Sequence, residues 1–149
     1  MPNSATNAPT SVEEAFQAAL TRYNEGEAAA TLLPTFVDLC RQDPKNEILL
    51  TCLSWLYLLE AKGEPALKAA QHAVKLSPLS AQSRVNLVLA MLETQKKGIR
   101  QEVERIQQIL QRDPEQRQEI LTNLQEGCRR RPDWPGLQRL QSWLGLEET

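Results

Sequence analysis

Apolar side chains recur along the chain at helical spacing, and turn residues interrupt them at regular intervals. The segments between these interruptions are about 12 to 17 residues long, which is the length of one short helix. Polar and apolar residues do not alternate over any long stretch, so strands are not predicted. The pattern predicts an all-α chain of eight short helices that pair into four antiparallel hairpins. The main interruptions are at Gly26, Pro44, Gly63, Pro78, Gly98 and Pro114.

The most apolar segment is ILLTCLSWLYLL, which runs from Ile48 to Leu59. Only Thr51 and Ser54 interrupt it. A helix that spans a bilayer needs about 20 apolar residues, and this segment is much shorter. The segment is therefore predicted to be a helix of a soluble domain, with no membrane insertion.

Several residues repeat at a spacing of 34 positions. A fixed period of this length predicts a repeat architecture, because one hairpin cannot bury its own apolar face and neighbouring hairpins must stack. The residues in register are Ala19, Leu53, Leu87 and Leu121, the pair Tyr23 and Tyr57, and the pair Pro44 and Pro78.

The repeat resembles the tetratricopeptide repeat family, whose pattern reads W-x2-L-G-x2-Y and then A-x3-F-x2-A-x4-P. The second unit is the best copy, with Leu50, Leu53, Ser54, Tyr57, Ala66, Ala70, Ala73 and Pro78 at the family's positions. The resemblance implies an α-solenoid of about four hairpins, a TPR-like superhelix, with units at about 13–46, 47–80, 81–114 and 115–146. Residues 1–10 are predicted to be a disordered leader, and 11–149 a single domain.

Some positions depart from this pattern. Pro34 falls inside the second helix of the first unit, where it should kink the helix or delay its start. The third unit reaches its proline, Pro114, two residues late, and the fourth keeps only Leu121. Pro135 and Gly145 are predicted to begin and end a terminal capping helix.

Charge gives little indication of the partner. The chain of 149 residues has a formal net charge of −2, so no overall basic field favours nucleic acid. The run Arg129–Arg131 is the only basic cluster. Such a run usually interacts with the free carbonyls and dipole at a helix end, and anion binding is the alternative.

Candidate chemistry is sparse. Cys40, Cys52 and Cys128 have no C-x-x-C spacing, and His72 has no identifiable partner residue. Reduced cysteines favour a cytoplasmic location, and no metal or cofactor is predicted. No glycine-rich phosphate loop is present either. The chain is therefore predicted not to be an enzyme.

In the tetratricopeptide family, the first helix of each hairpin lines a concave groove, and this implies where a partner would bind. A helical wheel places Ile48, Thr51, Trp55 and Leu59 opposite the core face of the second unit. The equivalent faces of the other units complete the predicted protein-binding site. They contribute Val85 and Leu89, Gln17 and Thr21, and Glu119 and Asn123.

An apolar centre with polar and acidic ends predicts the binding of an apolar peptide or helix with basic flanks. The resemblance to the tetratricopeptide family implies that such a protein acts as an adaptor or assembly factor. Gln17 and Thr21 occupy the positions of the family's carboxylate clamp, so binding of acidic chain ends is not predicted. The alternative is a structural subunit whose Trp55 face is permanently buried in a homodimer or hetero-oligomer. A further alternative is that another part of the same chain covers the Trp55 face, either the leader or the terminal helix with Trp134 and Trp143.

Overall fold

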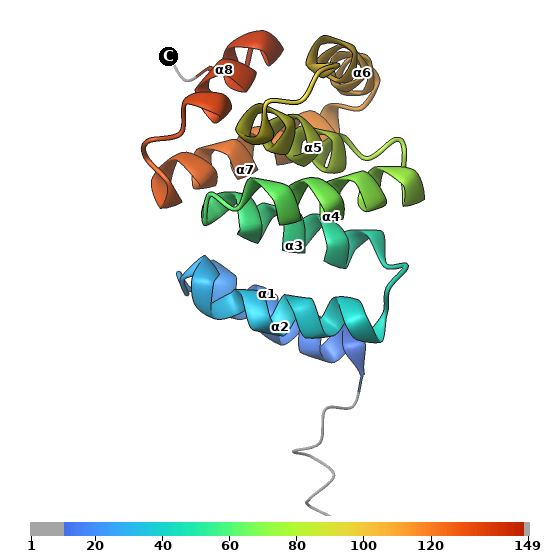
Figure 1. Cartoon of the computed structure of the whole chain (residues 1–149), viewed down its shortest axis with the longest axis vertical. Helices are drawn as coiled ribbons and strands as arrows, with labels where there is room; N and C mark the ends of the chain where they lie inside the picture. Colours follow the sequence, from blue (N-terminus) through green and yellow to red (C-terminus); the bar gives the residue numbers. More distant parts are fainter. Residues whose placement is uncertain (1–10, 148–149) are drawn as a thin grey trace, which may run out of the picture.

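The computed structural model describes residues 11–147, so the predicted leader lies outside the described residues. Within this range the chain is all-helical, with eight helices and no strand (Figure 1). None of these helices is long and apolar enough to cross a bilayer. The helices are α1 (Val12–Asn24), α2 (Ala29–Gln42), α3 (Glu47–Leu59), α4 (Gly63–Leu76), α5 (Ala81–Thr94), α6 (Ile99–Arg112), α7 (Pro114–Arg130) and α8 (Pro135–Leu144).

The N-terminal caps repeat along the chain. Each odd-numbered helix begins after a residue whose side chain accepts a hydrogen bond from the third helical residue's backbone N–H, and no even-numbered helix has such a cap. Side chains of this type satisfy an N–H group that has no partner inside the helix. The four caps, spaced 35, 34 and 33 residues apart, are Ser11, Asn46, Ser80 and Asp113.

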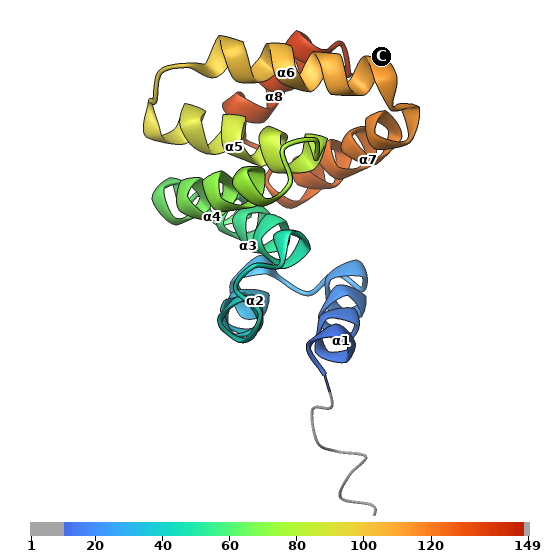
Figure 2. The ribbon, with the colours of Figure 1, turned by 90° about the vertical axis from the view of Figure 1, so that its right-hand side faces the viewer.

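The helices lie in layers along the long axis of the molecule. Figure 2 shows α1 and α2 at one end, α3 and α4 next, then α5, and α6 with α8 at the other end. From α1 to α8, each helix packs against the next in the chain, and α3, α5 and α7 also contact one another in succession. This arrangement is consistent with a helical repeat.

The closest packing is at the centre, where α3 and α4 meet and α4 meets α5. Ala66, Ala70 and Ala73 on α4 are completely buried, as the repeat pattern predicted. Small side chains at these positions let the helix axes approach, and Leu49 and Leu58 of α3 are completely buried as well. The apolar stretch quoted above is therefore largely core.

Pro34 does not delay the start of its helix. α2 begins at Ala29 and continues through Pro34 to Gln42. Pro34 is exposed, while Leu33 and Phe36 beside it are buried. The outer face of the helix accommodates the proline ring, and the inner face keeps its apolar stripe.

The terminal helix departs from a regular fourth hairpin. α8 begins with Pro135 and ends at Gly145, which has a φ of +67°, so its predicted bounds are confirmed. However, α8 packs on α5 and α6 as well as on α7. Figure 1 shows α8 beside α6 at the same end of the molecule. The segment between α7 and α8 therefore crosses back toward the central helices.

Gly127 of α7 lies where this crossing is tightest. A β-carbon at this position would lie 2.9 Å from Cη2 of Trp55 and 3.0 Å from Cδ1 of Leu137. Both neighbours are buried. Only a residue without a side chain lets α7 lie this close to α3 and α8.

We expect Gly127→Ala to destabilise the protein. Alanine should favour the helix by about 1 kcal/mol, but overpacking at the Trp55 contact should cost about 1–3 kcal/mol. Urea unfolding is the measurement, with Gln125→Ala on the same helix as the control for helix propensity alone. If Gly127→Ala were more stable than the wild type, the contact between α7 and Trp55 would have room for a methyl group.

Candidate functional site

Four apolar residues of the predicted binding face are buried or nearly so. Trp55 and Leu59 are each 8% exposed, and Val85 and Leu89 are completely buried. The prediction that Leu59, Val85 and Leu89 line an open groove is therefore wrong, and Trp55 lines a hollow only with the small part of its ring that stays exposed. The regular period placed the fourth unit further along the array, whereas α7 and the segment after it fold across the face of α3.

Trp134 covers Trp55. The two indole rings lie with their centroids 5.6 Å apart and their planes at 41°, and Trp134 is almost fully buried. The Nε1–H group of Trp55 donates a hydrogen bond of 3.0 Å to the hydroxyl of Tyr23 on α1. An internal segment therefore covers the Trp55 face, as one of the alternatives had it. Trp134 forms the cover, whereas Trp143 is 37% exposed.

The remaining predicted residues divide into two groups. Ile48 is 55% exposed, and it lies with Thr51, Glu119 and Asn123 around one continuous hollow. Gln17 and Thr21 are exposed on α1, but they do not line this hollow. The predicted site is therefore displaced, with its centre toward α1 and α7.

We call the first part of this hollow the central groove. It has a volume of about 250 Å³ and lies between α1 and α3, with single residues of α2, α5 and α7 completing its walls. Apolar side chains predominate, and amides and hydroxyls lie among them. Its lining residues are Leu20, Tyr23, Asn24, Phe36, Thr51, Cys52, Trp55, Leu56, Gln82 and Asn123.

The second part, which we call the mouth, continues from the central groove. The two parts share Thr51, Cys52, Gln82 and Asn123, and the mouth has a volume of about 340 Å³. It opens between the N-terminal halves of α3 and α7. Its other lining residues are Glu47, Ile48, Ser80, Gln116, Glu119 and Ile120.

A chain of side-chain amides fixes the floor shared by the two parts. Asn123 donates to Gln82 at 2.8 Å, and Gln82 donates to the buried Asn86 at 2.8 Å. Asn86 donates in turn to the carbonyl oxygen of Thr51 at 3.0 Å. This chain joins α7, α5 and α3 and sets the positions of the polar groups that a ligand would contact.

The mouth is acidic. Glu47 and Glu119 line it, while no Lys or Arg does so. The carboxylate of Glu47 accepts a hydrogen bond of 3.0 Å from Thr51, and Glu119 is exposed. The mouth therefore favours a ligand with a positive charge at this end.

The arginine run lies at the opposite end of the central groove. Arg130 donates to the carbonyl oxygens of Tyr23 and Glu27 at 2.6 and 2.9 Å, and Arg131 donates to that of Leu58 at 2.8 Å. Arginines at free carbonyls of helix ends were predicted, but these carbonyls belong to α1, its following turn and α3. Sequence alone gives no sign of this long-range contact.

None of the three cysteines, all of which lie within the described residues, forms a disulfide bond. Burial raises the pKa of Cys52 to about 12 and that of Cys40 to about 11, so both thiols stay protonated and weakly nucleophilic at neutral pH. Among residues 11–147, no three His, Cys, Asp or Glu side chains gather as metal ligands would.

Leu20 and Tyr23 are lining residues that the sequence analysis did not assign to the site. With Asn24 they form an i, i+3, i+4 stripe on α1, which a helical wheel of that segment would have shown. The sequence analysis named Tyr23 only as a repeat position in register with Tyr57. No protein-family model matches this chain, and no curated protein is significantly similar to it.

We expect Tyr23→Phe to destabilise the protein by about 1–3 kcal/mol, because the Nε1–H group of buried Trp55 loses its acceptor. Tyr57→Phe is the matched control. Tyr57 is half-buried, and its hydroxyl makes no hydrogen bond to any other described residue. Denaturant unfolding of the two variants should show a loss for Tyr23→Phe only. Equal losses would mean that the Trp55–Tyr23 bond contributes nothing specific.

Proposed function

We propose that this protein is a non-enzymatic interaction module of the tetratricopeptide type, an adaptor or assembly factor that binds an apolar segment of a partner protein. The observation that carries the proposal is the continuous hollow of central groove and mouth. Residues of α1, α3, α5 and α7, the first helices of the four predicted hairpins, supply nearly all of its lining. Concave sites with apolar walls and a few fixed polar groups are typical binding sites.

The lining indicates the chemistry of the partner. Leu20 and Ile48 offer apolar contacts along the hollow, and Glu119 offers a negative charge at the mouth. A segment with two or three apolar side chains, followed by Lys or Arg, complements this arrangement. The basic residue would lie at the mouth, and the apolar residues would enter the central groove.

The free energies of burial and association indicate a weak to moderate binding affinity for such a complex. Burial of roughly 200 Å² of apolar surface in the hollow would contribute about 5 kcal/mol. Association costs about 4–15 kcal/mol, so this contact alone cannot give tight binding. The partner must also use the acidic mouth or further surface on α1 and α7.

The competing role, a structural subunit, depended on an unpaired Trp55 face. Trp134 now accounts for the burial of that face within the chain itself. No remaining observation favours a permanent oligomer over a binding module.

Selection of peptides from a displayed library on the purified protein tests the proposal. We expect enriched peptides with apolar residues at helical spacing and a Lys or Arg flank. Ile48→Asp should weaken their binding at least tenfold, which corresponds to about 1.4 kcal/mol. Leu79→Asp is the matched control, because Leu79 is 76% exposed and lies outside the hollow.

Charge reversal gives a second test of the same peptides. Glu119→Lys should weaken binding of the basic-flanked peptides, and Glu104→Lys on the exposed side of α6 should not. If the peptides bind Ile48→Asp and Leu79→Asp with the same affinity as the wild type, the hollow is not the binding site.

A further inference from the structure

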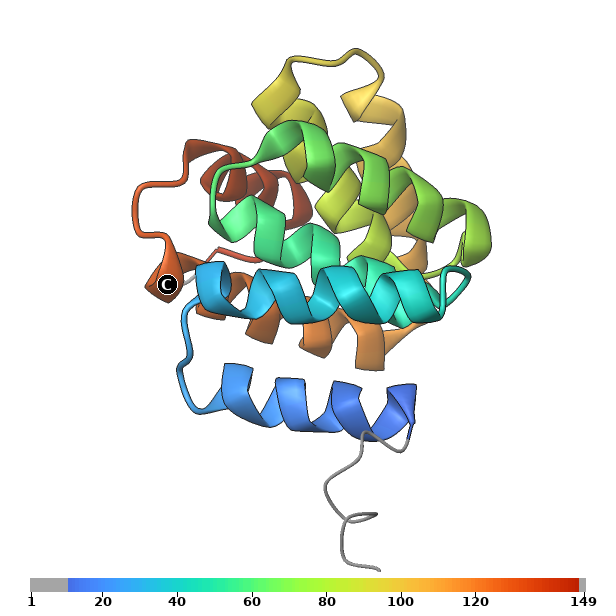
Figure 3. The same cartoon turned by 60° about the horizontal axis from the view of Figure 1, so that its bottom comes forward.

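α1 is a wall of the central groove, and its attachment to the rest of the molecule is narrow. Among the described residues, α2 is the only helix against which α1 packs extensively. The edge-to-face contact of Phe16 with Phe36, with ring centroids 6.1 Å apart, is part of that packing. Figure 3 shows α1 alongside α2, with α7 behind them and the α1–α2 turn near the C-terminal end of α7.

Among the described residues, Tyr23 makes the hydrogen bonds that join α1 to the helices beyond α2. Its hydroxyl accepts the hydrogen bond from Trp55 on α3, and its carbonyl oxygen accepts one from Arg130 on α7. Both ties lie at the C-terminal end of α1. Among residues 11–147, the side chains in the N-terminal part of this helix hydrogen-bond only within α1.

Arg130 is held in this position from several directions. Its guanidinium lies over the Tyr23 ring at 3.9 Å, and its Nε donates to Glu126 at 2.7 Å. It also donates to the carbonyl of Glu27 in the α1–α2 turn. A planar guanidinium that stacks and donates in several directions at once makes a contact that a lysine ammonium cannot reproduce.

The size of the hollow limits what enters while this contact is made. One turn of an α-helix, about 10 Å across and 5.4 Å long, occupies about 400 Å³. The central groove holds about 250 Å³, and the mouth about 340 Å³. The two parts together exceed this volume, but the central groove by itself admits side chains and not a whole helical turn.

We propose that Arg130 is a latch on α1. When its contacts with Tyr23 and Glu27 break, α1 moves away from α3 and α7 on its packing against α2, and the central groove widens to admit a helix. This inference concerns the regulation of the proposed binding site and rests on that proposed function. The test of this inference requires no partner, so a failure of the Arg130 inference and a failure of the proposed binding function appear in different experiments.

Cys52 reports on the opening. It lines both the central groove and the mouth, and burial keeps its thiol protonated. Opening would expose the partly buried thiol further and lower its pKa toward the ordinary range, so its alkylation would accelerate through both access and ionisation.

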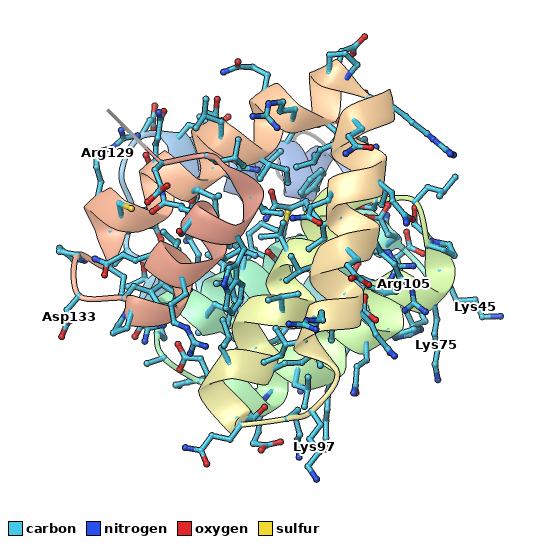
Figure 4. The ribbon with its side chains drawn as sticks, turned by 90° about the horizontal axis from the view of Figure 1, so that it is seen from above. Lys45, Lys75, Lys97, Arg105, Arg129 and Asp133 are labelled. Atoms are coloured by element: carbon cyan, nitrogen blue, oxygen red, sulfur yellow. The ribbon has the colours of Figure 1, made fainter. Side chains whose placement is uncertain are left out.

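The experiment follows alkylation of Cys52 by iodoacetamide at pH 8, with mass spectrometry to resolve the site, in the full-length protein. Hydrogen exchange of the α4 and α5 amides measures global unfolding in the same samples. Arg130→Ala should accelerate alkylation of Cys52 at least tenfold. Arg129→Ala is the matched control and should stay within twofold, because Arg129 pairs only with Glu126 and lies at the outer edge of the molecule (Figure 4).

The proposal requires that exchange in α4 and α5 stays unchanged while Cys52 accelerates. Equal alkylation rates in Arg130→Ala and Arg129→Ala would overturn it. Parallel acceleration at Cys52 and in α4 and α5 would also overturn it, since Arg130 would then act only on overall stability. Arg130→Lys serves as the milder variant and should give an intermediate Cys52 rate with α4 and α5 unchanged.

Discussion

The contact between Trp134 and Trp55 determines how the C-terminal part of this molecule is arranged. Trp134 lies in the segment between α7 and α8, and burying its ring against Trp55 draws that segment across α3. Gly127 permits the close approach of α7, and Arg131 ties the same segment to the carbonyl at the end of α3. Large aromatic side chains bury more apolar surface than any others, so this pair can override the direction that a regular repeat would impose.

The candidate site is a consequence of that arrangement. With the Trp55 face covered, the surface that stays open lies between α1 and the N-terminal halves of α3 and α7. Its floor is fixed by the amide chain from Asn123 to Thr51, and Tyr23 joins it to the covered face through the Trp55 bond. The hollow and the tryptophan contact are thus physically connected through Tyr23.

Much of the fold could be predicted from the chain. The apolar period and the turn residues located the eight helices, and the alanines of α4 were correctly placed in the core, because these features depend on local spacing. Of the four repeating caps, only Ser11 lies in a recognisable capping box, and the caps at Asn46, Ser80 and Asp113 were not predicted. The position of α8 depends on contacts between distant residues, so periodicity could not supply it. The site was displaced for the same reason: the predicted face of α3 was correct as a helical face, and Trp134 from far along the chain covered it.

The central claim is that the chain covers Trp55 with its own Trp134. Acrylamide quenching of Trp143→Phe tests it most directly, because this variant removes the one exposed tryptophan and leaves the buried pair. The account predicts blue-shifted emission, weak quenching and no dependence on protein concentration. Strong quenching at low concentration would show that Trp55 lies open, and protection that appears only at high concentration would show that another molecule covers it.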